Sequence, residues 1–469
     1  MNNTKVVVTI VPTSSDENTL RELFCNGMDV ARINMNFCTK EECLDIVNKI
    51  NKLNEEYSKK IATMIDLDGP RVRVNEIDGG EALLEEGDKI RIYIDDVIGD
   101  RTKFSVSYAG FANDVKVNDL IKVDDGKIVL KVIDIGTNYV LGEVVISGII
   151  KSNKTVNVPG RKLNIPFLQD KDMENIKFAS ENGIDFISLS FVRSYEDVLN
   201  VNDMLIELGN DHIEVLAKIE NADAYEDIDE ILKLSDGAIV ARGDLGVEVP
   251  MENIPLMQKN IINKCHLFGK VAIISTDFLS SMESEMMPTR AEVSDVANAV
   301  IDGTDAIMLS GETTMGKHPV ETLKIMEKII KATESGINPK MDENIECEMQ
   351  DITGSVAYSV AVCAKKLSAV AIVTPTISGY TARKIGKLRS NCPIVAISPS
   401  IDTVKSLALH YGVQPVLANN IETFDDIINM ARECTKAMMK VNEGDKIIIT
   451  GGYPFSKVKH TNFMKIEEL

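Results

Sequence analysis

Hydrophobic and polar residues follow different patterns in different parts of the chain. In 1–69 and in 165–340, short apolar runs alternate with longer stretches of helical periodicity. The apolar runs lie at 5–10, 30–35, 62–67, 186–191, 214–219, 237–242, 271–276 and 306–311, and helical patterns lie between them at 16–26, 39–58, 170–182, 194–208, 252–268 and 290–302. Apolar strands that alternate with helices indicate a parallel sheet covered on both faces. The eight runs therefore predict a closed (β/α)8 barrel, with an open parallel sheet as the alternative.

A strand-like pattern fills 70–164, between the third and fourth runs. Polar and apolar residues alternate there in four segments, at 89–94, 103–108, 128–133 and 139–146. Turn signals such as Asp78-Gly79-Gly80 and Asp124-Asp125-Gly126 separate the segments, and no stretch has a convincing helical pattern. We therefore expect a small all-β lid domain inserted into one loop of the barrel.

Alternation of strands and helices resumes near residue 350. Strands are predicted at 369–374, 393–398, 413–418 and 446–451, with helices at 352–367, 380–389, 401–411 and 423–441. Residues 336–350 are polar and acidic, which is typical of a linker. The predicted α/β protein thus has a catalytic barrel formed by 1–69 and 165–340, a lid at 70–164 and a C-terminal α/β domain at 350–469.

Composition narrows the class of protein. A net charge of −21 argues against a nucleic-acid-binding protein and against binding to anionic membranes. The apolar run near the N-terminus is too short for a signal segment, and no run approaches the roughly 20 residues of a membrane helix. The eight cysteines form no C-x-x-C pair, so neither a disulfide framework nor a zinc site is expected. These features predict a cytoplasmic protein.

Polar residues are concentrated where the predicted barrel strands end. The C-terminal ends of barrel strands meet at one face, where chemistry takes place. The residues at these ends are Arg32, Asn34, Asp66, Lys218, Glu220, Arg242, Asp244, Thr276, Ser310 and Glu312. Glu220 and Asp244 suit a hard divalent cation, whereas Lys218 and Arg32 could stabilise a phosphoryl group in transfer. Taken singly, each residue is better explained as part of a salt bridge at the barrel rim; together they indicate a site.

Several long motifs resemble the pyruvate kinase family over nearly the whole chain. They are EVLAKIE (214–220), SDGAIVARGDLGVEVP (235–250), PTRAEVSDVANAVIDGTDAIMLSGET (288–313) and VNVPGRKLNIPFLQDKD (156–172), with GMDVARIN (27–34) and IDLDGPRVR (65–73) as weaker matches. The resemblance implies a barrel with an inserted lid and a C-terminal regulatory domain, assembled as a homotetramer. It also implies that the enzyme acts in glycolysis with Mg²⁺ (or Mn²⁺), converting phosphoenolpyruvate and ADP to pyruvate and ATP.

The resemblance also assigns roles to individual residues. Lys218 corresponds to the lysine that neutralises the transferring phosphoryl group, and Arg32 to the arginine that contacts the phosphate. Glu220 and Asp244 correspond to the metal ligands, and Thr276 to the threonine beside the enolate. The amides of Gly243 and Asp244 would bind the substrate carboxylate; Gly243 is also explained by an ordinary strand-to-helix turn. Arg73 and Asn34 fall on the nucleotide side, and Ser310 and Glu312 in a network near the enolate.

This chain departs from the family pattern mainly in one corner. The K⁺ ligands would be Asn34, Asn36, Asp66 and the Leu67 carbonyl, but Asn36, Phe37, Leu67 and Asp68 replace the usual serine, histidine, threonine and lysine. Val11 and Asp277 replace a glycine and a glutamine elsewhere. Arg71 stands where K⁺-dependent members carry glutamate and K⁺-independent members carry lysine. We therefore predict that K⁺ is not required, because the Arg71 guanidinium, held by Asp66 or Asp68, takes the ion's electrostatic role. The alternative is that Arg71 points into the lid cleft and assists nucleotide binding.

A loop after the first C-terminal strand is a candidate effector site. It contains Thr376, Ser378, Gly379 and Thr381 and opens a predicted helix, an arrangement that suits an anion. The same residues are explained almost as well by a helix N-cap turn. The family binds a phosphate of its activator in a similar loop, so we predict a sugar-phosphate effector.

Two other functions are compatible with parts of the pattern. A metal-dependent aldolase or lyase acting on pyruvate enolate would use the Glu220–Asp244 pair but would not need Lys218, the lid or the C-terminal domain. A non-catalytic sensor is suggested by Phe37 and the altered corner, but the intact Lys218 and metal pair argue against it.

Overall fold

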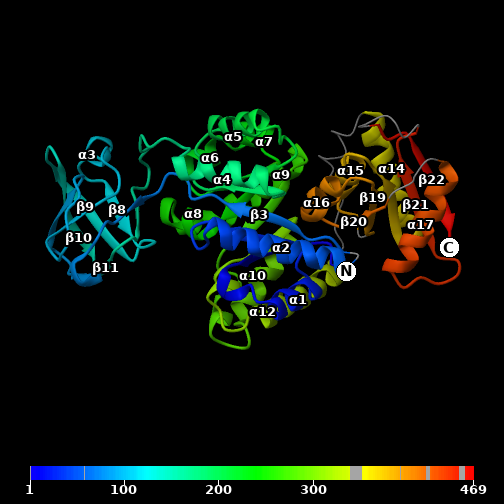
Figure 1. The fold of residues 1–469 in the computed structure, drawn as a ribbon, viewed down its shortest axis with the longest axis horizontal. Coiled ribbons are helices and arrows are strands. Elements are labelled where there is room, and N and C mark those ends of the chain that lie inside the picture. The colour runs from blue at the N-terminus through cyan, green and yellow to red at the C-terminus, as the bar shows by residue number, and fades with distance from the viewer. Residues whose placement is uncertain (1, 58, 338–350, 391, 419–422, 454–459) are drawn as a thin grey trace.

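The chain folds into three units arranged in a row (Figure 1). The computed structural model describes residues 2–57, 59–337, 351–390, 392–418, 423–453 and 460–469. The barrel is in the middle, with the lid on one side and the C-terminal unit on the other. The linker predicted at 336–350 falls almost wholly outside the described residues, and the exact domain boundaries stay predictions.

The central unit is a closed barrel of eight parallel strands, as predicted. The strands are β1 (Lys5–Ile10), β2 (Val30–Asn34), β3 (Ala62–Asp66), β13 (Phe186–Leu189), β14 (Glu214–Ile219), β15 (Gly237–Ala241), β16 (Val271–Ser275) and β17 (Ala306–Leu309). Closure comes from β1, which pairs in parallel with both β2 and β17. The open-sheet alternative is therefore wrong. Almost all strand residues are buried because side chains fill the barrel interior and helices cover its outside.

Helices surround the barrel, and local sequence signals explain where several of them begin. They are α1 (Glu17–Cys25), α2 (Lys40–Glu56), α4 (Asp170–Glu181), α5 (Tyr195–Glu207), α6 (Ala222–Glu226), α7 (Ile228–Leu234), α8 (Arg242–Glu248), α9 (Ile254–Phe268), α10 (Arg290–Ile301), α11 (Gly311–Thr314) and α12 (Pro319–Gly336). Four short 3₁₀ turns in and beside this unit are η1 (Pro12–Ser14), η2 (Asp78–Gly80), η3 (Met251–Asn253) and η4 (Ser280–Glu283). Thr39 with Glu42 and Thr289 with Glu292 form capping boxes that start α2 and α10.

The lid leaves the barrel after β3 and returns before α4. Its strands are β4 (Val72–Arg73), β5 (Glu81–Leu84), β6 (Lys89–Tyr93), β7 (Lys103–Ser105), β8 (Leu120–Val123), β9 (Ile128–Ile135), β10 (Tyr139–Ile146), β11 (Gly148–Lys151) and β12 (Thr155–Asn157). Seven of them form one sheet in the order β4-β12-β8-β9-β10-β6-β7, and β5 pairs with β11. The expectation of no helix is wrong for one turn, α3 (Phe111–Asp114). Phe111 is fully buried and places that turn over the lid's own hydrophobic core.

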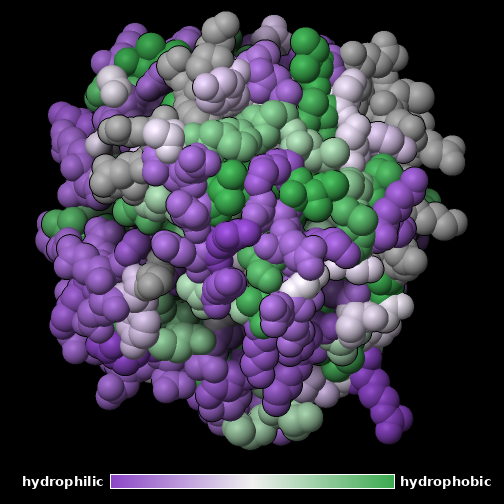
Figure 2. Space-filling model, turned by 90° about the vertical axis from the view of Figure 1, so that its right-hand side faces the viewer, coloured by the Kyte–Doolittle hydropathy of each residue, from purple (hydrophilic) through white to green (hydrophobic). Residues whose placement is uncertain are grey.

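The C-terminal unit has a five-stranded sheet in the order β20-β19-β18-β21-β22. The strands are β18 (Ala371–Pro375), β19 (Ile394–Ser398), β20 (Val413–Leu417), β21 (Lys446–Gly451) and β22 (Phe463–Glu468), and the helices are α14 (Ile352–Leu367), α15 (Tyr380–Lys387), α16 (Ile401–Ser406) and α17 (Phe424–Met438). The antiparallel edge strand β22 was not predicted. The face that this unit turns away from the barrel is mostly hydrophilic, with smaller apolar areas among the polar ones (Figure 2).

The predicted helix at 401–411 is wrong in its second half. α16 ends at Ser406, and a 3₁₀ turn, η5 (Leu407–Leu409), follows it. Ala408 and Leu409 pack against apolar residues inside the barrel, including Val7 and Phe186. Burial of this turn in the end of the barrel therefore overrides the helical pattern of the sequence.

The two ends of the barrel face different units. We call the end at which the strands finish the mouth, and the end at which they begin, next to the C-terminal unit, the floor. Three ion pairs cross from the floor to the C-terminal unit: Lys405–Asp185 at 3.2 Å, Arg383–Glu214 at 2.8 Å and Arg389–Asp305 at 2.7 Å. Asp185 and Asp305 directly precede β13 and β17, and Glu214 begins β14. The C-terminal unit is thus attached to the same strands whose other ends form the mouth.

Candidate active site

The mouth encloses a cavity of about 580 Å³ that is lined by most of the predicted strand-end residues, although not by Glu220. Those that line it are Arg32, Asn34, Asp66, Arg71, Lys218, Asp244, Thr276 and Ser310. These residues meet in one cavity because each of them except Arg71 lies in the last residues of a barrel strand or just after it. The parallel topology therefore brings together residues that are up to 278 positions apart in the sequence, from Arg32 to Ser310 (310 − 32).

Lys218 is the buried cation at the centre of the mouth. Its Nζ lies 2.7 Å from Glu220 Oε1 and 3.5 Å from Asp66 Oδ2, and it donates a hydrogen bond of 2.9 Å to Ser190 Oγ. Burial alone would lower the pKa of Lys218, but the nearby Asp66, Glu220 and Asp244 carboxylates outweigh burial and raise it. Lys218 is therefore charged at neutral pH and suits charge stabilisation rather than proton abstraction.

Asp66 and Arg32 form a second buried pair beside Lys218. Arg32 Nη2 lies 2.5 Å from Asp66 Oδ2, and Arg32 Nη1 donates to Thr9 Oγ1 at 2.9 Å. Burial would raise the pKa of Asp66, but the charges of Arg32 and Lys218 keep it below its ordinary value. Arg32 Nε is buried and has no hydrogen-bond partner in the described part of the chain. One donor of this fixed guanidinium is thus available to an anion.

Glu220 and Asp244 are the candidate metal ligands. Glu220 is completely buried, and its Oε2 accepts a hydrogen bond of 2.7 Å from the Phe191 N–H. Its Oε1 contacts Lys218 but has no hydrogen-bond partner among the residues that the structure covers. The Asp244 carboxylate likewise forms no hydrogen bond or ion pair within those residues, and its charge helps burial to raise the pKa of Glu220. Two such carboxylates fit a divalent cation.

The number of protein ligands at this position is small. No group of three or more His, Cys, Asp or Glu side chains that could hold a metal occurs within the described ranges. A cation at Glu220 and Asp244 would therefore take its remaining ligands from water and substrate, which is typical of Mg²⁺ with phosphorylated substrates.

Thr276 is held in an unusual backbone conformation at the end of β16. Thr276 and Asp277 have φ values of 72° and 59°, in the left-handed region that non-glycine residues rarely adopt. Arg242 stabilises the turn because its Nη2 donates to the Thr276 carbonyl at 2.6 Å while its Nη1 pairs with Asp295 at 2.8 Å. Backbone strain of this kind is often found at functional sites. Arg242, which the sequence placed among the strand-end charges, supports the site instead of facing the cavity.

Gly243 and Glu312 make contacts within the protein. The Gly243 N–H donates to Thr276 Oγ1 at 2.8 Å, so a carboxylate bound to this amide would have to replace that bond. The nearest atom to a Cβ at Gly243 would be Thr276 Oγ1 at 3.5 Å, an ordinary contact. Glu312 accepts bonds from the Ser310 and Leu279 amides at 2.7 and 3.3 Å. It therefore fixes the loop after β17, and only Ser310 of this pair lines the cavity.

Asp68 organises the corner in which the sequence departs from the family pattern. Its Oδ1 accepts from Asn36 Nδ2 at 2.8 Å and from Arg73 Nη2 at 3.3 Å, and lies 3.5 Å from Arg71 Nε. Asp66 is engaged by Arg32 and Lys218, so Asp68 is the carboxylate that holds Arg71. Leu67 is buried in the core, whereas Phe37 is 67% exposed at the edge of the cavity.

The candidate effector loop lies at the start of α15. Gly379 has a φ of 74° and its N–H donates to Thr376 Oγ1 at 2.9 Å, which is a local turn ahead of the helix. Thr381 is buried and shares a hydrogen bond of 2.7 Å with Thr461. The Thr381 hydroxyl is therefore engaged inside the unit, and Thr376 and Ser378 are the hydroxyls left nearer the surface.

The structure adds four residues to the site that the strand-end pattern did not single out. Thr9 and Ser190 bind Arg32 and Lys218, Ser188 donates to Asp66, and Phe191 binds Glu220. They lie in or just after the first and fourth apolar runs, at 5–10 and 186–191. Applying the strand-end rule to every run would have found Thr9 and Ser190, but not Ser188, which lies within β13, or Phe191, which acts through its backbone N–H.

Comparisons with known proteins agree over almost the whole chain. Residues 1–323 match the family model "Pyruvate kinase, barrel domain", and residues 354–467 match "Pyruvate kinase, alpha/beta domain". A protein named pyruvate kinase from Geobacillus stearothermophilus is 40% identical over 467 residues, which cover 99% of this chain and 80% of that protein. One of the same name from Clostridium perfringens (strain 13 / Type A) is 38% identical over 482 residues, which cover 100% of both chains.

Proposed function

The chain belongs to the pyruvate kinase family, and from that premise we propose how its own residues transfer the phosphoryl group of phosphoenolpyruvate to ADP. The product is pyruvate, with ATP as the phosphorylated nucleotide. The observation that supports this assignment best is the buried, charged Lys218, which contacts Glu220 beside an Asp244 carboxylate that has no partner within the described residues. A cation of this kind is suited to a phosphoryl group whose negative charge spreads over its oxygens during transfer.

Lys218 and Arg32 stabilise the charge on the transferring group. The terminal phosphate oxygen of ADP attacks phosphorus while the bond from phosphorus to the enol oxygen breaks. Lys218 is held by Asp66, Glu220 and Ser190, and Arg32 by Asp66 and Thr9, so neither side chain has to reorganise during the reaction. The pyruvate enolate that leaves then takes a proton at carbon.

Glu220 and Asp244 would hold a Mg²⁺ ion (or Mn²⁺). Glu220 Oε1, which contacts Lys218 but has no hydrogen bond within the described residues, and the Asp244 carboxylate, which has no partner there, fit such an ion. When bound, it supplies positive charge to the phosphate and enolate oxygens. Thr276 lies on the same rim, and its hydroxyl and the Gly243 amide would face the enolate end of the substrate. Arg73 and Asn34 would contact the nucleotide.

Arg71 takes the place of a monovalent cation in this proposal, so that K⁺ is not required. Its guanidinium is fixed by Asp68 and lies with its Cζ 4.5 Å from the centroid of the Phe191 ring. Arg71 also lines the cavity at the hinge of the lid, as the alternative of a nucleotide-binding arginine would require. Assays in tetramethylammonium buffer, with and without K⁺, decide between the two roles; activation of about tenfold or more by K⁺ would contradict the first.

The proposed reaction is tested by coupling pyruvate release to lactate dehydrogenase. Pyruvate should form from phosphoenolpyruvate only when ADP and a divalent cation are both present. An aldolase or lyase would act without ADP, and a sensor would release no pyruvate. The family match over both the barrel and the C-terminal unit is not expected for either of those alternatives.

Regulation, assembly and location are further parts of the proposal. We expect a sugar phosphate to bind at Thr376, Ser378 and Gly379, with Thr381 only supporting the loop from inside. A panel of sugar phosphates that leaves the phosphoenolpyruvate saturation curve unmoved would contradict this effector site. A homotetramer is expected from the family and is tested by sedimentation. We place the enzyme in the cytoplasm with its substrates; no helix in the described residues is long and apolar enough to cross a membrane.

A further inference from the structure

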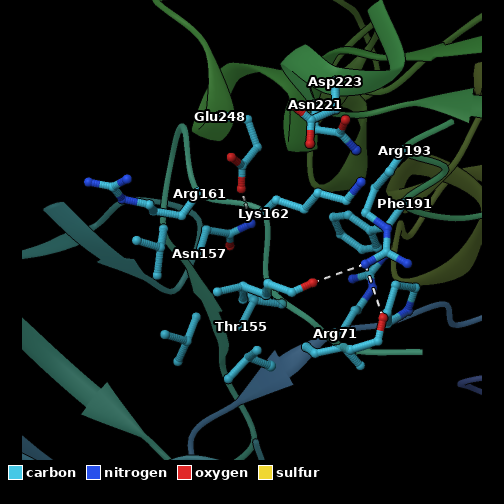
Figure 3. Close-up of a pocket in the computed structure, with 16 residues that line it drawn as sticks. Arg71, Thr155, Asn157, Arg161, Lys162, Phe191, Arg193, Asn221, Asp223 and Glu248 are labelled. Carbon is cyan, nitrogen blue, oxygen red and sulfur yellow. Dashed lines mark hydrogen bonds between the residues drawn. The ribbon is translucent and has the colours of Figure 1, made fainter. Parts of the chain in front are cut away.

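Phe191 occupies a strained position just beyond the end of β13. Its φ is 56°, in the left-handed region, which is rare for a bulky aromatic residue. The close-up of the lid hinge shows Phe191 and Arg71 beside each other at the barrel side of the pocket, with Arg193 next to them (Figure 3). A strained backbone that persists between two functional groups suggests that the surrounding contacts require it.

The backbone of Phe191 is tied to Glu220. Its N–H donates to Glu220 Oε2 at 2.7 Å, and the next residue, Val192, accepts a bond of 2.9 Å from Asn221 Nδ2. Two adjacent residues after β13 thus bind two adjacent residues after β14. The left-handed turn aims the Phe191 N–H at Oε2 of the carboxylate and so fixes that oxygen, while Oε1 faces Lys218.

The ring of Phe191 contacts Arg71. The guanidinium carbon lies 4.5 Å from the ring centroid, a cation–π arrangement. Burial alone would lower the pKa of Arg71, but Asp244 and Glu220, followed by Asp68 and Asp66, raise it. Arg71 is therefore within the field of both metal-binding carboxylates, yet it forms an ion pair with neither of them among the described residues.

The same loop also binds the segment through which the chain returns from the lid to the barrel. Arg193 Nη1 donates to the carbonyls of Leu163 and Ile165 at 3.1 and 3.0 Å (Figure 3). Arg71 lies in the segment through which the chain leaves the barrel for the lid, between β3 and β4. Residues 191–193 consequently contact both of the segments that connect the barrel to the lid.

We propose that Phe191 is a positioning residue that orients Glu220 through its N–H and, through its ring, keeps the Arg71 guanidinium beside the metal-binding carboxylates without pairing with them. This inference rests on the proposed role of Glu220 and Asp244 as metal ligands. Without the ring, Arg71 is free to pair with Glu220 or Asp244 and so competes with the divalent cation. The ring therefore lets a fixed cation and a metal ion share one small site.

The test measures binding of Mn²⁺ alone to the purified enzyme by electron paramagnetic resonance, without substrates. Phe191→Leu removes the aromatic face and keeps the bulk, and should weaken binding about tenfold, the lower end of what loss of a residue that orients a ligand costs. Phe191→Tyr keeps the face and should bind within twofold of wild type. Adding Arg71→Met to Phe191→Leu removes the competing cation and should restore the affinity.

Phe278→Leu provides a matched control. The Arg242 Cζ lies 4.2 Å from the centroid of the Phe278 ring, just beyond the end of β16, and Phe278 has no hydrogen bond or cation–π contact with Glu220 or Arg71 in the described part of the chain. Its Mn²⁺ affinity should stay within twofold of wild type, and thermal unfolding without metal should show every variant folded. Wild-type affinity in Phe191→Leu, or no recovery in the double variant, would overturn the inference. Failure of Glu220→Gln to remove the Mn²⁺ site would instead contradict the proposed metal ligands.

Discussion

The mouth and the floor of the barrel are built from the same strands, and each carries carboxylates next to cations, but the two ends differ in how completely the carboxylates are paired. At the floor, Asp305 accepts from the Ala272 amide at 2.8 Å and pairs with Arg389, and Asp185 accepts from the Thr63 amide at 2.7 Å and pairs with Lys405. At the mouth, Glu220 Oε1 lacks a hydrogen bond, and Asp244 lacks any partner among the described residues.

The paired charges at the floor attach the C-terminal unit to the barrel, whereas the incompletely paired carboxylates at the mouth are suited to binding a ligand. A buried polar group without a partner costs free energy, so proteins retain one mainly where a ligand, a water molecule or an ion completes it. Incomplete pairing of the carboxylates at the mouth thus marks the site more clearly than the presence of charge does, because the Nε atoms of Arg383 and Arg389 at the floor also lack a hydrogen-bond partner among the described residues.

The largest effect is expected from the carboxylates of the mouth. Glu220→Gln and Asp244→Asn each remove one negative charge from the proposed cation site and should reduce kcat by about a thousandfold or more, the size of effect seen when one charged stabiliser of a transition state is lost. Near-normal Mg²⁺-dependent activity of both variants in the coupled assay would rule out the metal assignment.

Lys218→Met should separate phosphoryl transfer from enolate chemistry. Transfer should be lost, because no other side chain replaces the central cation. Metal-dependent exchange of the methyl protons of pyruvate with solvent should persist, as followed by nuclear magnetic resonance in deuterium oxide. Loss of both reactions would show that Lys218 has a structural role or donates the proton.

At the floor, the expected effect is on stability and not on catalysis. Asp305→Ala leaves the buried Arg389 without its carboxylate and should lower the free energy of unfolding by about 3 kcal/mol. The activity of the folded fraction should remain within twofold of wild type. Denaturant unfolding measures the free energy of unfolding, and the coupled assay measures the activity. A floor variant that loses activity but no stability would contradict the proposed difference between the two ends of the barrel.

Arg71→Glu tests whether K⁺ can replace the positive charge of the Arg71 guanidinium at the mouth. The variant should become K⁺-dependent, with activation of about tenfold, or about 1.4 kcal/mol of barrier. Asn36, which is bound to Asp68 and Lys171, limits how well K⁺ is held. Arg71→Lys is the matched control and should stay independent of K⁺; equal responses of the two variants to K⁺ would contradict the exchange.

The floor should also show a pH dependence of stability. His266 Nε2 lies 2.6 Å from Arg389 Nη2 and 2.9 Å from the Gly303 carbonyl oxygen. Burial, together with Arg389, lowers the pKa of His266 to about 3. The unfolded chain takes up this proton near pH 6.5, so stability is complete above that pH and is lost toward pH 3, by at most about 1.4 kcal/mol per pH unit.

Replacing His266 by Gln should remove this part of the acid sensitivity. Denaturation midpoints measured between pH 7 and 5 should then fall less steeply than those of the wild type. Identical slopes for the two proteins would show that His266 does not contribute.

Periodicity predicted the barrel strands and the strand-end residues because both depend on local patterns. It did not predict the floor, since Arg389 and Asp305 are 84 residues apart and neither lies at a position that the strand-end rule selects. The end of α16 was missed because Leu409 is buried by the barrel and not by its own unit. Nothing in the sequence indicates the left-handed backbone of Phe191 or Thr276, which contacts with distant residues maintain.

Closure of the barrel by β1 and β17 has a consequence for synthesis of the protein. The first barrel strand cannot meet its last partner until about 300 further residues have been made, which at ~5–20 residues per second takes on the order of 15–60 s. β3 likewise waits for β13 while the lid, which has its own core, is made and can fold. During that interval the apolar β1 to β3 segment is a nascent chain with unpaired edges, so we expect a ribosome-associated chaperone to shield it.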